Sequence, residues 1–291
     1  MKAFVFPGQG AQFEGMGLEL YQNNAEAKKI FDIADNILGF ELSKVMFYGN
    51  SEELKQTKIT QPALFVHSIA TLRANPQSMP DAVAGHSLGE FSALVANGSL
   101  TFEDGLSLVY QRAMAMQAAC DTNPGTMAAI LGLENEIVAE ICNKIDEVVV
   151  AANYNCPGQL VISGSLLGVQ EAMKQLTESG AKRAIQLEVG GAFHSPLMES
   201  AKIQLEAAIQ KIEFNTPICP IYQNVNGAAE TEPIQIKNNL ILQLTGPVMW
   251  TQTIQNMITD GIQTFVEVGG TGKVLSGLIK KVDRNSETLS L

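Results

Sequence analysis

Short apolar segments alternate with helical patterns along most of this chain, and this alternation limits the folds open to it. We expect a first strand at Ala3–Phe6, ended by Pro7-Gly8, and a helix over residues 25–38, where apolar residues recur at helical spacing. A short apolar strand at Ala82–Ala84 is expected to lead into a helix over residues 90–96. Parallel strands joined by helices form sheets that are covered on both faces. The pattern therefore predicts an α/β fold with a mostly parallel sheet.

The middle of the chain follows a different order of elements. The order is β-α-β-β-α-β, which is that of a ferredoxin-like unit. Pro124-Gly125 and Gly190-Gly191 mark its two ends. We therefore expect a small ferredoxin-like domain over residues 126–192, inserted into a large α/β domain made of residues 1–125 and 193–291. The elements expected in the small domain are Met127–Leu133, Glu136–Ile145, Val148–Ala152, Gln159–Ser163, Gly168–Ser179 and Arg183–Val189.

Two further expectations concern segments rich in polar residues. The stretch Asn153–Gly158 is expected to be a turn, because it combines Asn, Pro and Gly between two strands. The last eight residues are polar, and we expect them to be frayed.

Composition excludes several classes of protein. Hydrophobic residues make up 46% of the 291 residues, enough for a substantial core. With 19 Lys and Arg against 30 Asp and Glu, the net charge is 19 − 30 = −11, which argues against a nucleic-acid partner. No apolar run approaches the ~18 residues of a membrane span. The four cysteines are scattered without C-x-x-C spacing, so we expect reduced thiols, no metal site and a cytoplasmic protein.

Gly85-His-Ser-Leu-Gly89 is the strongest local signal. It matches G-x-S-x-G and stands between an expected strand and an expected helix, where such a motif presents a nucleophilic serine on a strained turn. Ser87 would lie at the N-terminus of the helix, where the Leu88 N–H and the helix dipole stabilise an oxyanion. An ordinary glycine-rich turn is the alternative.

A serine nucleophile needs a base, and the chain has only three histidines. His86 neighbours the serine, and its side chain should diverge from it. His67 lies in an apolar helical pattern and is expected to be packed. His194 stands in a loop at the boundary of the small domain, so elimination favours it as the base. The sequence indicates no Asp or Glu as the third member of a catalytic triad. A backbone carbonyl that orients the imidazole is an alternative.

Two glycine-rich loops resemble nucleotide-binding motifs without matching them. The first, Phe6–Gln12, has Phe13 where the dinucleotide fingerprint needs glycine. The second, Gly269–Lys273, has Glu267 where the leading glycine of a phosphate loop belongs. We expect neither to bind a nucleotide. The first loop can instead bring the backbone N–H of Gln9 close to the serine as a second oxyanion donor.

Arg112 is the most informative charged residue, because its helical neighbours are all apolar. An unpaired buried charge costs roughly 3–5 kcal/mol. Either a distant acid or solvent meets the guanidinium, or its fork grips a carboxylate that arrives with the substrate. The neighbours at helical spacing are Leu108, Val109, Ala115 and Met116.

Several motifs in order make the chain resemble the malonyl-CoA:acyl-carrier-protein transacylases of fatty-acid synthesis and the related acyltransferase domains of polyketide synthases. The resemblance covers nearly the whole chain, although Gly269–Lys273 departs from the Gly-Pro-Gly-Lys usual in the family. The fold it implies is a hydrolase-like large domain with a ferredoxin-like insertion. The motifs are Phe6–Gln12, Thr60–Ala63, Gly85–Glu90, Arg112 with Met116-Gln117, Asn155–Gln159, Gly191–Met198, Gln243 to Trp250 and Val266–Gly269.

The resemblance implies roles for the residues of the reaction centre. Ser87 would carry the acyl group as an ester, and His194 would act as general base and then general acid. The main-chain carbonyl that orients this imidazole in the family matches Gln243. The N–H groups of Gln9 and Leu88 would form the oxyanion hole.

The resemblance also implies roles around the substrate. Arg112 would bind the free carboxylate of the malonyl group. Asn155, Met116 and His86 would line the cleft. Phe193 would fill the space that a branching methyl group needs, as in malonyl-selective members.

The function implied is ping-pong transfer of malonyl from malonyl-CoA to the phosphopantetheine thiol of acyl carrier protein. We expect no cofactor, no metal, no nucleic acid and no membrane partner, and a monomer. Three alternatives remain open. They are a trans-acting polyketide synthase acyltransferase, a serine esterase or thioesterase, and a binding protein with a dead site.

Overall fold

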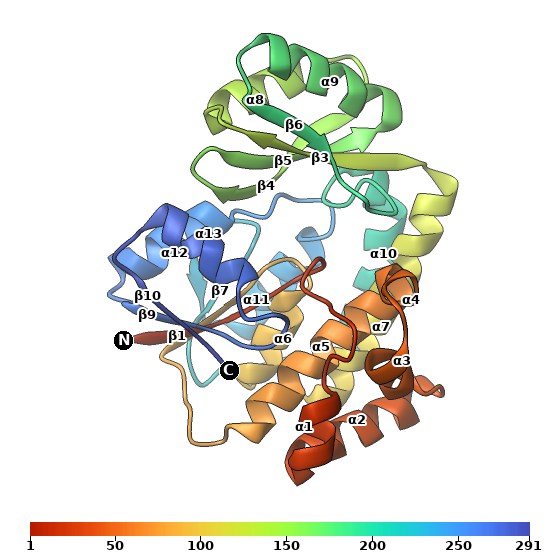
Figure 1. Ribbon diagram of the computed structural model, residues 1–291, viewed down its shortest axis with the longest axis vertical. Helices are drawn as coiled ribbons and strands as arrows, with labels where there is room; N and C mark the ends of the chain where they lie inside the picture. Colours follow the sequence, from red (N-terminus) through yellow and green to blue (C-terminus); the bar gives the residue numbers. More distant parts are fainter.

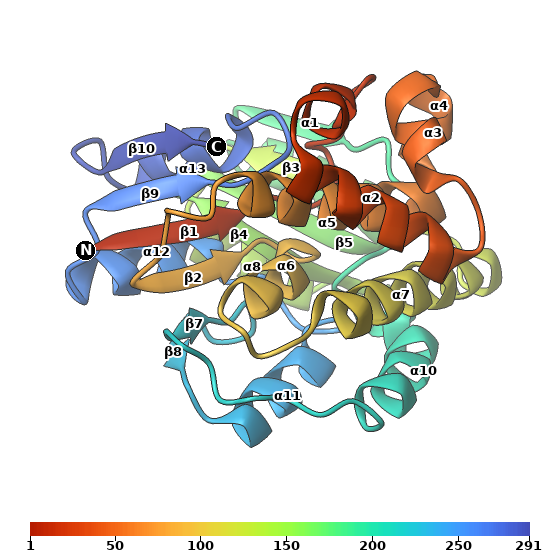
Figure 2. The ribbon, with the colours of Figure 1, turned by 90° about the horizontal axis from the view of Figure 1, so that it is seen from below.

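The computed structural model describes all 291 residues and contains two separate sheets (Figure 1). The larger sheet has the order β10-β9-β1-β2-β7-β8, and every pair in it is parallel except β7 with β8 (Figure 2). The prediction of a mostly parallel sheet is therefore confirmed. Its strands are β1 (Lys2–Phe6), β2 (Ala82–Gly85), β7 (Ile221–Tyr222), β8 (Ala229–Glu230), β9 (Thr264–Glu267) and β10 (Glu287–Ser290).

Helices cover both faces of this sheet, as the side chains of β1 require. Phe4 and Phe6 point into the main core, whereas Ala3 and Val5 point into a second core on the opposite face. Successive strand residues face opposite sides, so an apolar run such as this one needs cover on both. The helices are α1 (Leu18–Asn23), α2 (Ala25–Leu38), α3 (Leu42–Tyr48), α4 (Ser51–Lys55), α5 (Thr57–Ala74), α6 (Gly89–Ala96), α7 (Phe102–Thr122), α10 (Glu199–Ile209, after a 3-10 turn at Pro196–Met198), α11 (Pro233–Leu242), α12 (Trp250–Thr259) and α13 (Val274–Val282).

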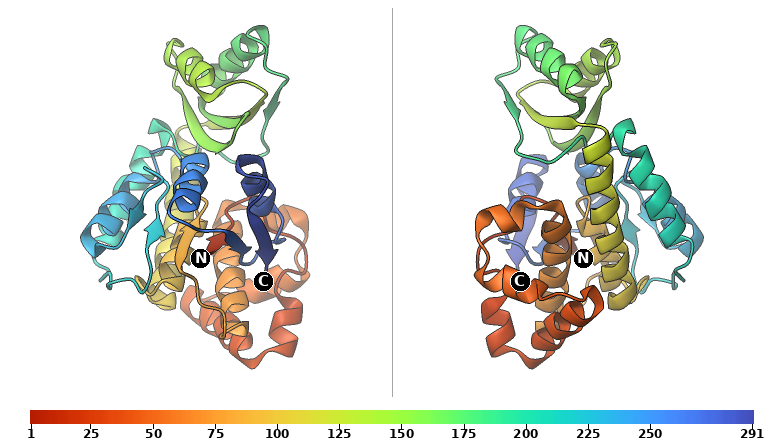
Figure 3. Two further views of the ribbon diagram at one scale, coloured as in Figure 1. Left: turned by 90° about the vertical axis from the view of Figure 1, so that its left-hand side faces the viewer. Right: turned by 90° about the vertical axis from the view of Figure 1, so that its right-hand side faces the viewer.

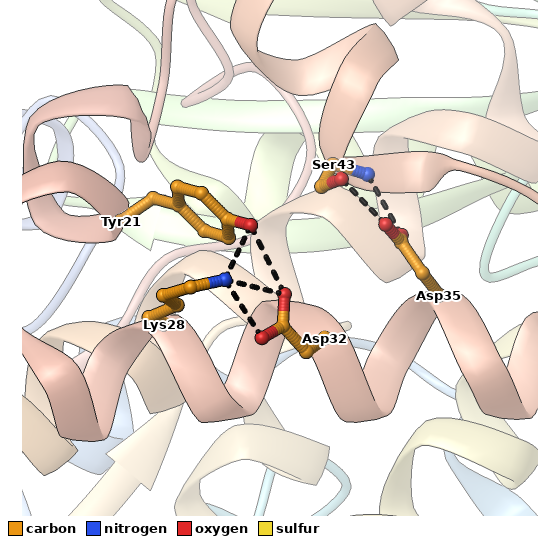
Figure 4. Close-up of polar contacts among 5 residues, drawn as sticks. All are labelled: Tyr21, Lys28, Asp32, Asp35 and Ser43. Carbon is orange, nitrogen blue, oxygen red and sulfur yellow. Dashed lines mark hydrogen bonds and ion pairs between the residues drawn. The ribbon is translucent and has the colours of Figure 1, made fainter.

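Polar contacts fasten the first helices to one another (Figure 4). Lys28 and Asp32 of α2 form an ion pair at 2.9 Å, and both bond to the Tyr21 hydroxyl of α1. Asp35 accepts from the backbone N–H of Ser43 at 2.9 Å and from its hydroxyl, which holds α3 to the end of α2.

None of the chain's helices combines the length and the apolar character needed to cross a membrane.

The smaller sheet is antiparallel, in the order β4-β5-β3-β6, and lies with its two helices at one end of the molecule (Figure 3). The predicted β-α-β-β-α-β order is confirmed, while the domain boundaries at residues 126 and 192 stay a prediction. The elements are β3 (Gly125–Leu131), α8 (Asn135–Asn143), β4 (Val149–Cys156), β5 (Gln159–Ser165), α9 (Leu166–Glu178) and β6 (Arg183–Gln186).

The prediction of a turn at Asn153–Gly158 is wrong for most of its length, because β4 continues to Cys156. The strand is irregular there, with register shifts against β5. Its other edge pairs with the segment before α12: the Val248 N–H donates to the Ala152 carbonyl at 2.8 Å, and the Tyr154 N–H donates to the Val248 carbonyl at 2.9 Å. These bonds offset the poor strand propensity of the polar residues.

The prediction of a frayed C-terminus is also wrong. Residues 287–290 form β10, which pairs in parallel with β9 at the edge of the large sheet. The Thr264 hydroxyl donates to the Glu287 carboxylate at 2.7 Å across this pair. Polar side chains suit an edge strand that faces solvent, so the segment has no apolar pattern from which to predict it.

Candidate active site

The backbone is left-handed at only two non-glycine residues, Ser87 (φ 52°) and His194 (φ 58°). Such a conformation costs roughly 1–2 kcal/mol per residue and persists where the surrounding structure enforces it. Ser87 lies between the end of β2 and the start of α6, as the G-x-S-x-G motif predicts. His194 lies in the loop after β6. The two residues singled out as nucleophile and base are thus the two strained positions of the chain.

Two glycines let the loop after β1 pack directly against this serine turn. A Cβ on Gly89 would lie 2.0 Å from the Phe6 carbonyl oxygen, and one on Gly8 would lie 2.5 Å from the His86 carbonyl oxygen. No side chain fits at either position. The close packing places the residue after Gly8, Gln9, in the wall of the same cavity as Ser87.

The Ser87 hydroxyl and the His194 imidazole form a hydrogen bond, with Oγ 2.7 Å from Nε2. The other ring nitrogen, Nδ1, lies 3.0 Å from the Gln243 carbonyl oxygen and 3.1 Å from that of Gly246. Carbonyls only accept, so Nδ1 carries the proton and Nε2 is free to accept from the hydroxyl. A main-chain carbonyl thus stands where a third acid would stand in a triad, and the carbonyl of Gly246 is a second one that the sequence did not indicate.

Burial lowers the pKa of His194 to about 3, and the nearby positive charge of Arg112 lowers it further, against the two carbonyl bonds, which raise it. The imidazole is therefore neutral at neutral pH, and a neutral imidazole is the form that can accept a proton.

Arg112 of α7 is 1% exposed and takes part in none of the chain's ion pairs. Its Nη1 donates to Gln61 Oε1 at 2.7 Å. Its Nη2 lies 3.1 Å from Ser87 Oγ and 3.3 Å from Gln243 Oε1, and its Nε has no partner. Burial lowers the pKa of the guanidinium to about 10, against the negative charge of Glu90, which raises it, so the group stays charged at neutral pH. The site thus contains a buried cation without a bonded anion, next to the serine.

A cavity of about 170 Å³ opens onto Ser87 and His194. Seven of the ten predicted site residues line it. The other three, Leu88, Arg112 and Gln243, are buried and do not line it. The lining residues are Gln9, His86, Ser87, Met116, Met127, Asn153, Asn155, Val161, Leu187, Val189, Phe193 and His194.

His86 diverges from the serine, as predicted, and reaches the smaller sheet. Its Nε2 lies 2.8 Å from the Asn155 Oδ1 of β4, so this bond joins the serine turn to the small sheet across the cavity. His67, the third histidine, is buried away from the cavity, where its Nδ1 accepts from the Gly270 N–H at 3.1 Å.

Sequence reasoning missed Gln61, which connects the parts of the site. It holds Arg112 through its Oε1, and its Nε2 lies 3.3 Å from Gln9 Oε1 and 3.2 Å from the Met116 sulfur. The signal available in the sequence was its place in the Thr60–Ala63 motif, and the structure adds that its amide is buried in α5 and therefore needs partners. The structure contains no group of three or more His, Cys, Asp or Glu side chains placed to hold a metal ion.

The chain is similar to known proteins along nearly its whole length. The family of acyl transferase domains matches residues 3–290. The malonyl CoA-acyl carrier protein transacylase of Bacillus subtilis is 46% identical, over 99% of this chain and 92% of the relative. The crystal structure of an acyl carrier protein S-malonyltransferase from Vibrio cholerae matches with a TM-score of 0.95 and 41% identity, over 100% of this chain and 96% of that one.

A further solved structure contains a type II polyketide synthase acyl carrier protein in complex with its malonyl-transacylase. It matches with a TM-score of 0.96 and 36% identity, over 100% of this chain and 95% of that one.

Proposed function

Since this chain belongs to the acyl transferase domain family, among the malonyl-CoA:acyl carrier protein transacylases, we propose that it transfers malonyl from malonyl-CoA to the phosphopantetheine thiol of acyl carrier protein, for fatty-acid synthesis. One observation carries the proposal for the chemistry. Ser87 Oγ lies 2.7 Å from a neutral imidazole and 3.1 Å from a buried, charged guanidinium. A serine activated for acyl transfer therefore lies beside a binding group for a carboxylate.

In the first half-reaction, Ser87 Oγ attacks the thioester carbonyl of malonyl-CoA while its proton passes to His194 Nε2. The tetrahedral intermediate collapses, the C–S bond breaks, and the departing thiolate of CoA takes the proton back. The N–H groups of Gln9 and Leu88 stabilise the oxyanion, and one such donor contributes about 2.7–4 kcal/mol.

In the second half-reaction, His194 takes the proton from the carrier protein's thiol, and the thiolate attacks the Ser87 ester. The C–O bond breaks, and Ser87 Oγ recovers the proton. No group outside the chain and its two substrates is needed, which supports our proposal that the enzyme works without a cofactor. One chain supplies every side chain of the site, which supports a monomer, and four buried free cysteines suit the reducing cytoplasm.

Arg112 binds the malonyl carboxylate in both half-reactions. A bidentate carboxylate would bond to the fork, where Ser87 Oγ now accepts from Nη2, and would release the hydroxyl for attack. Phe193 and Met116 are apolar lining residues of the cavity. We propose that they surround the methylene carbon of the malonyl group and that the Phe193 ring occupies the space that a branching methyl would need.

We expect brief incubation with malonyl-CoA to add one malonyl group to the intact protein, at Ser87. Intact-protein mass measures the adduct, with Ser87→Ala and acetyl-CoA as controls. The adduct should be absent in Ser87→Ala and should discharge onto added acyl carrier protein. Release of malonate to water would instead favour a thioesterase. Preference for a polyketide rather than a fatty-acid carrier protein would favour the acyltransferase of a polyketide synthase.

The acylation rate should be nearly independent of pH across the neutral range. With the pKa of His194 lowered to about 3, the base is already neutral in the free enzyme at pH 5 to 8. Protonation removes the base only as the pH falls toward that value, so kcat/KM for CoA release should stay flat down to about pH 5. A decline of kcat/KM with an apparent pKa near 6.5, the ordinary value for histidine, would contradict this.

A further inference from the structure

The side chain of Asn224 bonds to the serine turn on both sides of His86. Its Oδ1 accepts from the Ser87 N–H and its Nδ2 donates to the Gly85 carbonyl, each at 2.6 Å. The residue is 1% exposed. The backbone pairing of β2 with β7 ends at Tyr222. Beyond that point, the amide of Asn224 does what a continued strand would do.

The position of Asn224 is itself fixed from two directions. Its backbone N–H donates to Glu90 Oε2 at 2.8 Å, and its carbonyl accepts from the Met249 N–H at 2.8 Å. Glu90 lies in the first turn of α6, three residues after Ser87, and its other oxygen accepts from Gln223 Nε2 at 3.1 Å. The contacts therefore form a closed loop from the serine turn through Asn224 to the helix that the same turn begins.

We propose that Asn224 is a positioning residue, whose amide holds the left-handed backbone of Ser87 in place and so aims the hydroxyl at His194. The inference rests on the proposed function, in which Ser87 is the nucleophile. The Ser87 N–H and Gly85 carbonyl flank a strained residue, and the peptide after Ser87 carries the Leu88 N–H of the oxyanion hole. If the amide is removed, the backbone that carries both the Ser87 hydroxyl and the Leu88 N–H is no longer held in position.

Asn224→Ala tests the proposal. We expect the first-order rate of Ser87 acylation at saturating malonyl-CoA to fall on the order of 100-fold, because a misplacement of about 1 Å can cost that much. KM should change little, since Asn224 does not line the cavity. Sulfonylation of Ser87 by phenylmethanesulfonyl fluoride, a probe with no carboxylate for Arg112, should slow by a similar factor.

Asn97→Ala is the matched control. Asn97 is equally buried, at the far end of α6, and its amide also joins a carbonyl, that of Cys219, to an N–H, that of Ser99. Its loss should lower the melting temperature comparably and leave both Ser87 rates near those of the wild type. If Asn224→Ala does not fold, Asn224→Asp keeps the volume and the acceptor for Ser87 while losing the donor to Gly85, and a lower acylation rate is expected.

Wild-type rates in a folded Asn224→Ala or Asn224→Asp protein would overturn the positioning role. The role is also overturned if Asn97→Ala slows both reactions as much as Asn224→Ala does. Failure of the proposed function looks different: the wild-type protein and Asn97→Ala would then form no malonyl adduct at Ser87, whatever the Asn224 variants do.

Discussion

His194→Ala is expected to lower the rate of malonyl transfer by at least about a thousandfold, because the base that accepts the Ser87 proton is removed. The imidazole lies 2.7 Å from Oγ, whereas His86 bonds to Asn155 and His67 to the Gly270 N–H. The same group serves both half-reactions, so CoA release and discharge onto carrier protein should slow together. Single-turnover release of CoA and formation of malonyl-carrier protein measure the two steps.

His67→Ala is the matched control for this substitution. His67 is also a buried histidine whose burial lowers its pKa, to about 4, and one ring nitrogen accepts a backbone hydrogen bond, but it lies outside the cavity. The His67→Ala protein should be less stable than the wild type and should transfer malonyl at the wild-type rate. Near-normal transfer by a folded His194→Ala protein would exclude His194 as the base and leave Ser87 without one.

The parts of the site that the sequence predicts well are encoded locally. The serine turn needs a strand, two glycines and a helix within a few residues, and Gly85–Gly89 contains that pattern with its flanking elements. The start of α7 is likewise encoded locally, because the Thr101 side chain caps the helix by accepting a hydrogen bond from the Asp104 N–H three residues later. His194 could be predicted as the base by elimination, because the chain has only three histidines.

Contacts between segments that are distant in the sequence could not be predicted in this way. Arg112 was expected to meet a distant acid, solvent or a carboxylate of the substrate. Its bonded protein partners are instead the amide oxygens of Gln61 and Gln243 and the serine hydroxyl. Amides have no charge pattern that identifies them as partners, and α5, α7 and the end of α11 meet only in the fold. The predictions for β4 and β10 were wrong for the same reason. Each polar segment forms backbone hydrogen bonds with a segment that is distant in the sequence.

Arg112→Ala should change which acyl group the enzyme accepts. Without the guanidinium, the malonyl carboxylate would enter a buried site unpaired, at a cost of roughly 3–5 kcal/mol, so kcat/KM for malonyl-CoA should fall by about a hundredfold to a few thousandfold. Acetyl-CoA has no carboxylate and should lose far less. Arg112→Lys should be intermediate, because lysine keeps the charge but not the fork.

The ratio of kcat/KM for malonyl-CoA to that for acetyl-CoA is the measurement that isolates this role. Arg112 also donates to Ser87 Oγ and lowers the pKa of His194. Its loss should therefore raise that pKa and shift the acid limb of acetyl transfer to higher pH. Those two effects act on every substrate alike, whereas the carboxylate contact acts on malonyl alone. An equal loss for both substrates would mean that Arg112 organises the serine and does not select the acyl group.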